Sequence, residues 1–316
     1  MVCIERADAD ALANDPQALA QIDNAQRDRP GPPALVEDRC WKLVYRYGAY
    51  RIVIHRAQTG ALTLNAGVDE PRTRECLSRA IELVTPLVPY AKTMIARARA
   101  KFGDRWDDPD IGAAKYVVCD PPFGADTLLH EINHMLADGA CLNDPEGAPI
   151  CFDDAGDLPP RKIAYVPKLP LSVVEGRGGF EVVQRNYFVA SGEQSVVLLH
   201  DELLAYAIDA DVNAALIGTA TKPDKVIALP LIAYLTVHYW ELIRRDHRDD
   251  FDRLLGANGS MRGAFDRLLA HVERSYVAWH AARAKLPSKV QQQQARGEAK
   301  LWQLYVDTKR RLFASP

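Results

Sequence analysis

Two histidines four residues apart constrain this chain more than any other feature, in the segment His130-Glu131-Ile132-Asn133-His134. Side chains at this spacing lie on one face of an α-helix, so a helix here would set the two imidazoles side by side. The surrounding pattern predicts a helix over residues 125–138, with Gly139 as its C-terminal cap. Apolar residues recur at helical spacing on a separate face: Leu128, Ile132, Met135 and Leu136. We therefore expect a helix with one buried face and one polar face that carries both histidines.

This pattern of side chains suits a zinc site. Imidazole nitrogen binds Zn²⁺ at about 2.0–2.1 Å, and a glutamate between two such ligands can act as general base toward a zinc-bound water. The pattern thus predicts that His130 and His134 bind one Zn²⁺ per chain and that Glu131 is the general base. The alternative is a solvent-facing helix with two surface histidines.

A small sheet is predicted before this helix. Residues 41–47 and 50–55 are rich in β-branched and aromatic residues, with a hairpin turn between them, and residues 61–64 add a third strand. Residues 115–119 form a further short strand. A second strand pair is expected after the helix, through residues 162–166 and 180–189. The fold class that follows is α+β.

The rest of the chain reads as helix. Helices are predicted over residues 72–102, with breaks at Pro86 and Pro89, over 197–217, and through most of the chain from residue 225. We expect three regions: a peripheral helix and linker at 1–34, a region at 35–224 that contains the histidine helix, and a helical region at 225–316.

Charge and motifs exclude several classes of function. Residues 225–316 hold 16 Lys+Arg against 9 Asp+Glu, whereas residues 1–224 hold 23 against 33. The basic residues are dispersed and lack interleaved aromatics, so we expect no nucleic-acid partner. The sequence contains no P-loop, GxGxxG or GxSxG motif, which leaves nucleotide binding and serine-hydrolase chemistry unsupported.

The sequence predicts a cytoplasmic protein with reduced thiols, and it leaves export as a leaderless effector open. The start of the chain carries acids where a signal peptide needs an apolar run, and no stretch is long enough for stable membrane insertion. Six cysteines are irregularly spaced and none forms a C-x-x-C pair.

The histidine helix resembles the active-site helix of the zincin metallopeptidases. The resemblance covers that helix, residues 115–119 before it and one helix further on. It implies a zincin-like fold, in which a small mixed sheet lies over the active-site helix and a helical C-terminal half follows. Residues 115–119, or another strand of that sheet, would then line the cleft and pair with extended substrate.

The third ligand decides the type of zincin. Metzincins extend the motif as HExxHxxGxxH, but Ala137 and Ala140 stand at the glycine and last histidine positions. Cys141 follows one residue later and is a minor alternative ligand.

Gluzincins take the third ligand, a glutamate, from a second helix downstream. Glu202, in the helix predicted over residues 197–217, is the candidate, with Asp201 and His200 as alternatives. A metal-bound imidazole usually donates its other N–H to a carboxylate or carbonyl, so outer carboxylates are expected behind the histidines; Asp209 is the first choice and Asp138 the second.

Peptide hydrolysis also needs a donor to the developing oxyanion. Tyr206 and Tyr187 are the candidates, and His200 could donate instead. The resemblance therefore implies a zinc-dependent, gluzincin-type endopeptidase that acts on protein or peptide substrates. Two alternatives remain: a binding module whose zinc is structural or whose site is inactive, and a helical adaptor with a basic tail.

Overall fold

The chain comprises two units in a computed structural model. The first unit contains Met1–Ile81 and Asp104–Gly124, and the second contains Glu82–Gly103 and Ala125–Pro316. These boundaries differ from the three regions expected from the sequence. The structure describes residues 4–16, 19, 33–39, 42–47, 50–56, 62–68, 70–108, 112–117, 122, 124–155, 158–166, 186–190, 192–217, 228–285 and 289–314.

The first unit contains a four-stranded antiparallel sheet in the order β1-β2-β3-β4. Its strands are β1 (Ala34–Arg39), β2 (Lys42–Tyr47), β3 (Tyr50–Arg56) and β4 (Leu62–Val68), and helix α1 (Arg6–Ala13) contributes to the same core. Apolar residues pair across β2 and β3, with Leu43 opposite Ile54 and Tyr45 opposite Ile52. The Tyr45 hydroxyl donates to Asp10 on α1 over 2.6 Å. The predicted hairpin and third strand are confirmed.

Three details of the predicted sheet structure are wrong. The sheet is antiparallel throughout rather than mixed, because only a few residues separate consecutive strands and such short connections join antiparallel neighbours. Of the strand expected at 115–119, Lys115 and Tyr116 belong to the 3₁₀ turn Ala113–Tyr116, Val117 follows that turn outside any strand, and residues 118–119 lie outside the described residues. The second strand pair is absent from its described parts, where Arg161–Ala164 is a 3₁₀ turn and Asn186–Ala190 a π-helix.

Hydrogen bonding explains why residues 161 and 162 form no strand pair with residues 186–189. The backbone N–H groups of Arg161 and Lys162 donate to the carbonyls of Gln194 and Gly192, at 3.1 and 2.9 Å. Only glycine fits at position 192, because a Cβ there would lie 2.7 Å from the Lys162 Cβ and 2.4 Å from the Phe188 carbonyl oxygen.

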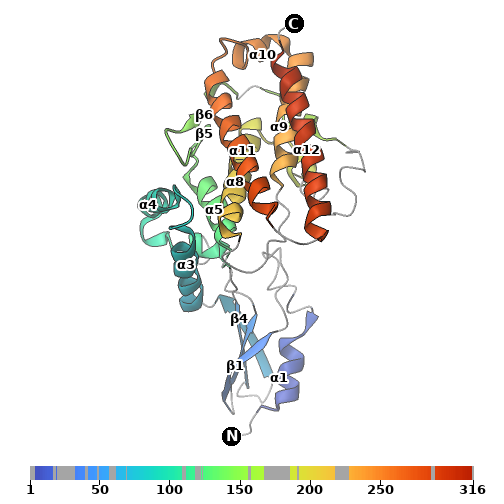
Figure 1. Ribbon diagram of the computed structural model, residues 1–316. Helices are drawn as coiled ribbons and strands as arrows, with labels where there is room; N and C mark the ends of the chain where they lie inside the picture. The colour runs from blue at the N-terminus through green and yellow to red at the C-terminus, as the bar shows by residue number, and fades with distance from the viewer. Residues whose placement is uncertain are drawn as a thin grey trace. The chain divides into compact units, whose positions relative to one another are not determined.

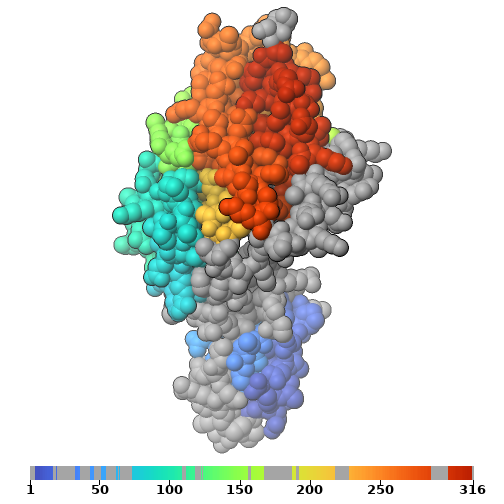
Figure 2. All heavy atoms as spheres, viewed as in Figure 1, coloured from blue at the N-terminus to red at the C-terminus, as the bar shows by residue number. Residues whose placement is uncertain are grey.

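The second unit is a helical assembly around α8 (Figure 1). Helix α8 packs against α5, α9 and α11, and α12 packs along α9. Apolar residues surround most of α8, so most of its residues are buried. In the face shown in Figure 2, α11 (orange) leaves little of α8 (gold) visible. The helix bounds of this unit are α4 (Ala91–Phe102), α5 (Ala125–Leu136), α8 (Val196–Leu216), α9 (Leu229–Asp246), α10 (Arg248–Leu254), α11 (Arg262–Arg283) and α12 (Lys289–Phe313). Helix α3 (Glu70–Val84) belongs to the first unit up to Ile81.

The main helix predictions are confirmed. The chain breaks between α3 and α4 around Pro86 and Pro89, and it ends α4 at Gly103, whose φ is 54°. Helix α5 ends two residues earlier than predicted, and Gly139 follows with a φ of 58°. Among the described residues, no helix combines the length and apolarity needed to cross a lipid bilayer.

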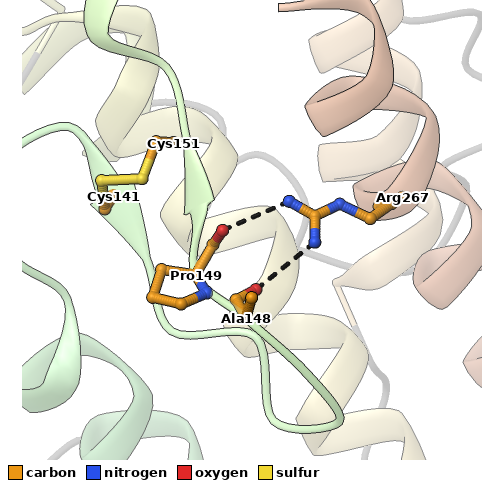
Figure 3. Close-up of a disulfide and its surroundings, with 5 residues drawn as sticks. All are labelled: Cys141, Ala148, Pro149, Cys151 and Arg267. Atoms are coloured by element: carbon orange, nitrogen blue, oxygen red, sulfur yellow. Dashed lines mark hydrogen bonds between the residues drawn. A yellow bond between two sulfur atoms is a disulfide. The ribbon is translucent and has the colours of Figure 1, made fainter.

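A short hairpin follows α5 and contains a disulfide. Strands β5 (Cys141–Leu142) and β6 (Ile150–Cys151) pair directly, and Cys141 is bonded to Cys151. Arg267 on α11 donates to the carbonyls of Ala148 and Pro149 at 3.5 and 3.2 Å, which holds the hairpin against α11 (Figure 3). The expectation of reduced thiols is wrong for these two cysteines, because the chain reversal places them opposite each other. Cys76 is disulfide-bonded as well.

Candidate metal centre

Helix α5 presents its histidines as its sequence pattern predicts. Leu128, Leu129 and Ile132 are fully buried, whereas His134 is half-buried on the polar side. His130 is 8% exposed, because α8 packs over this part of α5.

The structure brings together the three residues expected to bind metal. The Nε2 atoms of His130 and His134 lie 3.1 Å apart. Glu202 Oε2, from α8, lies 3.8 and 3.7 Å from those two nitrogens. A tetrahedral ion with ligand distances of about 2.0–2.1 Å would separate its ligand atoms by about 3.3 Å. The three side chains therefore surround a space of the size that one zinc ion needs.

The carboxylate oxygen of Glu202 supports the fit independently of these distances. Glu202 Oε2 is buried and has no hydrogen-bond partner among the described residues. A buried, unsatisfied carboxylate oxygen is costly in a native protein. An ion between Glu202 and the two imidazoles would satisfy it.

Two aspartates on α8 lie behind the histidines, on the side away from the space between them. His134 Nδ1 lies 2.6 Å from Asp201 Oδ2, so an N–H on Nδ1 donates to this carboxylate and leaves Nε2 with its lone pair toward the site. His130 Nδ1 lies 3.2 Å from Asp209 Oδ2. Asn133 donates to the other oxygen of Asp201 over 3.1 Å. Carboxylates in this position are typical partners of metal-binding imidazoles.

The field of these carboxylates favours positive charge at the site. Burial opposes protonation of His134, yet Asp201, Glu202 and Glu131 together raise its pKa to about 9. Burial likewise opposes protonation of His130, and Asp209 outweighs it, so this pKa is also raised. The same charges would stabilise a cation held between the imidazoles.

The structure places the alternative ligands elsewhere. Asp201 binds the back of His134, and Cys141 is in the disulfide and offers no thiolate. Asp138, the second choice for an outer carboxylate, is exposed, and its backbone pairs with that of Cys141.

Zinc binding is expected to depend on His134 and Glu202. Asp201→Asn, which removes a partner behind His134, should weaken zinc binding roughly 10–100-fold. His134→Ala and Glu202→Ala, which each remove a ligand, should weaken it by more than that. Equilibrium dialysis with elemental analysis measures the zinc affinity of each variant. His280→Ala, which removes an exposed imidazole from α11, should bind as the unmodified chain does. Undiminished binding in the Glu202 variant would contradict the assignment of the third ligand.

His200 is a core residue, which corrects its predicted roles as alternative metal ligand or oxyanion donor. It is 0% exposed, and its Nε2 accepts a hydrogen bond from the Trp240 indole over 3.0 Å. Its ring stacks on Trp240 and contacts Phe152, with ring centroids 6.0 and 4.3 Å apart. Burial lowers the pKa of His200 to about 3.

This neutral histidine should make the fold sensitive to acid. The folded state requires a neutral His200. The stability that depends on this residue is therefore fully present above its unfolded pKa of about 6.5, and it is lost as the pH falls toward its folded pKa. The free energy of unfolding should therefore decrease by about 1.4 kcal/mol per pH unit below pH 6.5 from this residue alone.

Comparison with His200→Gln, whose amide keeps an acceptor for Trp240, isolates the contribution of His200 to the free energy of unfolding. Between pH 6.5 and 4.5 the unmodified chain should lose about 2 kcal/mol more than the variant, in urea titrations of both metal-free proteins. Equal losses would show that His200 is not the acid-sensitive group.

A cavity of about 440 Å³ opens beside the candidate metal ligands. Its described lining consists of His134, Ala137, Gly139, Arg161, Tyr187, Gln194, Leu198, Asp201 and Glu202. Tyr206, the first candidate for oxyanion donor, packs its ring against His130 with centroids 5.0 Å apart. Tyr187 lines the cavity, and its hydroxyl lies 3.3 Å from that of Tyr206.

Sequence reasoning missed Arg161. It follows two prolines in an irregular segment, so neither periodicity nor ligand spacing draws attention to it. Burial and the neighbouring Glu202 carboxylate raise the pKa of Tyr187, which keeps this hydroxyl protonated. The cavity wall therefore offers both a hydroxyl donor and a guanidinium close to the candidate metal ligands.

No model of a known protein family, no curated protein and no solved structure matches the chain.

Proposed function

We propose that this chain is a zinc-dependent hydrolase that cleaves peptide bonds, most simply as an endopeptidase. The observation that carries the proposal is the buried, unsatisfied Glu202 Oε2, which faces the Nε2 atoms of His130 and His134. Three protein ligands beside a cavity are typical of catalytic zinc sites, whereas structural sites use four.

Each residue has a role in this proposal. His130, His134 and Glu202 would hold the ion, and Asp201 and Asp209 would keep the imidazoles in the binding orientation. A zinc ion at this position supplies a Lewis acid that polarises a carbonyl and lowers the pKa of water.

The proton transfers fall to Glu131, which is half-buried on α5 and close enough to His134 to raise its pKa. Glu131 would accept a proton from the attacking water and return it to the leaving amine nitrogen. The Tyr187 hydroxyl would donate a hydrogen bond to the oxyanion that develops on the scissile carbonyl.

A peptide library tests the proposal. The zinc-loaded chain should cleave internal bonds of end-blocked peptides, and mass spectrometry identifies the products. Removal of zinc with a chelator should stop cleavage, and added zinc should restore it. A chain that binds one zinc and cleaves nothing in the library would favour a binding module, and a chain that binds no zinc would contradict the metal site itself.

A further inference from the structure

A buried cation, Arg161, lies in the wall of the cavity beside the candidate metal ligands. Arg161 is 2% exposed and lines the same cavity as His134 and Glu202. Its backbone N–H donates to the Gln194 carbonyl over 3.1 Å, and its Nη2 donates to Gln194 Oε1 over 2.6 Å. The guanidinium carbon also lies 5.7 Å from the centroid of the Tyr187 ring. These contacts give the guanidinium a defined orientation.

The other charged groups in this wall already have roles in the site. Asp201 accepts from His134, and Glu202 faces the two imidazoles. Among the described residues that line the cavity, Arg161 is the one lysine or arginine. Burial lowers the pKa of Arg161 while the Glu202 carboxylate opposes that shift, and a guanidinium remains charged at any physiological pH. A desolvated cation in a binding cavity is a strong partner for an anion.

We infer that Arg161 recognises a carboxylate of the substrate, so that the chain prefers peptides with an acidic group near the scissile bond. This inference rests on the proposed function. The planar fork of a guanidinium matches the two oxygens of a carboxylate, which no lysine does equally well. The carboxylate belongs either to an aspartate or glutamate side chain or to a free C-terminus.

Small hydroxamates test the inference without a known substrate. A hydroxamate group binds zinc, and the monohydroxamates of malonic, succinic and glutaric acid each keep one carboxylate, at increasing distance from the hydroxamate. Each is compared by calorimetry with the analogue in which an amide replaces that carboxylate. At the best length, the zinc-loaded chain should bind the carboxylate form about 10–100-fold more tightly, the range for one charge-assisted hydrogen-bonded pair.

Variants of Arg161 assign the preference to this side chain. In Arg161→Gln the preference should fall below threefold while one zinc per chain is retained. Arg161→Lys keeps the charge and loses the planar fork, so its preference for the carboxylate form should lie between those of the unmodified chain and Arg161→Gln. Gln194→Glu should also reduce the preference, because a carboxylate next to the guanidinium competes with the ligand. The comparison in the unmodified chain stands by itself if a variant fails to fold.

The outcomes separate this inference from the proposed function. Equal affinity for the carboxylate and amide forms, with both bound through zinc, would overturn the inference and leave the zinc site intact. An equal loss of both forms in Arg161→Gln would overturn it as well, since Arg161 would then act on the metal-binding group. If the unmodified chain binds neither zinc nor any of the hydroxamates, the proposed function is contradicted instead.

Peptides then distinguish the two sources of the carboxylate. One pair is blocked at both ends and differs by a single internal Glu or Gln, and the other pair differs by a free or amidated C-terminus. With Glu131→Gln as the binding protein, affinity measures recognition without turnover. A preference in the first pair identifies acidic side chains, a preference in the second identifies the C-terminal carboxylate, and no preference in either overturns the inference.

Discussion

Glu131→Gln is expected to reduce peptide cleavage by about 10²–10⁴-fold, the usual contribution of a general acid–base group, while one zinc ion per chain is retained. The amide preserves the size of the side chain and cannot accept a proton from water. Glu131 lies on α5 between the two histidines, and its charge contributes to the raised pKa of His134. Rates measured with the best peptide of the library, together with zinc content, separate a lost base from a lost metal.

The matched control is Glu75→Gln, because Glu75 is exposed on α3 and pairs with Arg79 on the same helix. This variant should cleave at the unmodified rate. If Glu131→Gln cleaves as fast as the control, the role of Glu131 as general base is refuted. If it loses zinc, the charge of Glu131 serves to retain the metal and the catalytic role remains without support.

The second large effect concerns stability. Arg283→Met is expected to lower the free energy of unfolding by about 3–5 kcal/mol, because it removes the Arg283 guanidinium from the buried charge of Glu298. Arg283 on α11 and Glu298 on α12 form an ion pair in which each side chain is 3% exposed. The guanidinium carbon of Arg283 also lies 5.4 Å from the centroid of the Trp279 ring. Urea unfolding followed by tryptophan fluorescence measures the change.

Two further variants test the cause. Arg248→Met removes one partner of an exposed pair on α10, with Asp252 at 2.7 Å, and should cost less than about 1 kcal/mol. The double variant Arg283→Met with Glu298→Leu should regain most of the lost stability, since both buried charges are gone. A loss in Arg283→Met no larger than in Arg248→Met would show that burial does not strengthen the pair.

Much of the helical structure could be predicted because its signals are local. The apolar stripe of α5 and Gly139 depend on residues within a few turns of one another, and the same is true of the break at Pro86 and Pro89. The β2–β3 hairpin is equally local. The irregular segments at 161–166 and 186–190 could not be predicted, because their backbone groups bond to residues 192–194 and to their own neighbours.

In the candidate site, too, local features could be predicted from the sequence and contacts between distant segments could not. Helical spacing alone places His130 and His134 on one face of α5, and it places Asp201, Glu202 and Asp209 within one sector of α8. Spacing cannot decide which of two adjacent acids meets the front of an imidazole. The packing of α8 on α5 decides that Asp201 meets Nδ1 of His134 and that Glu202 faces Nε2.

The sequence by itself therefore determined the histidine pair, its helix and the short set of acids that could complete a metal site, because each depends on helical geometry over a few residues. Only the tertiary structure decided that His200 lies in the core against Trp240, that Cys141 is bonded to Cys151, and that Arg161 lines the cavity. The physical reason is that burial and pairing depend on segments distant in the chain. A polar side chain acquires its role from the partners that the fold brings to it.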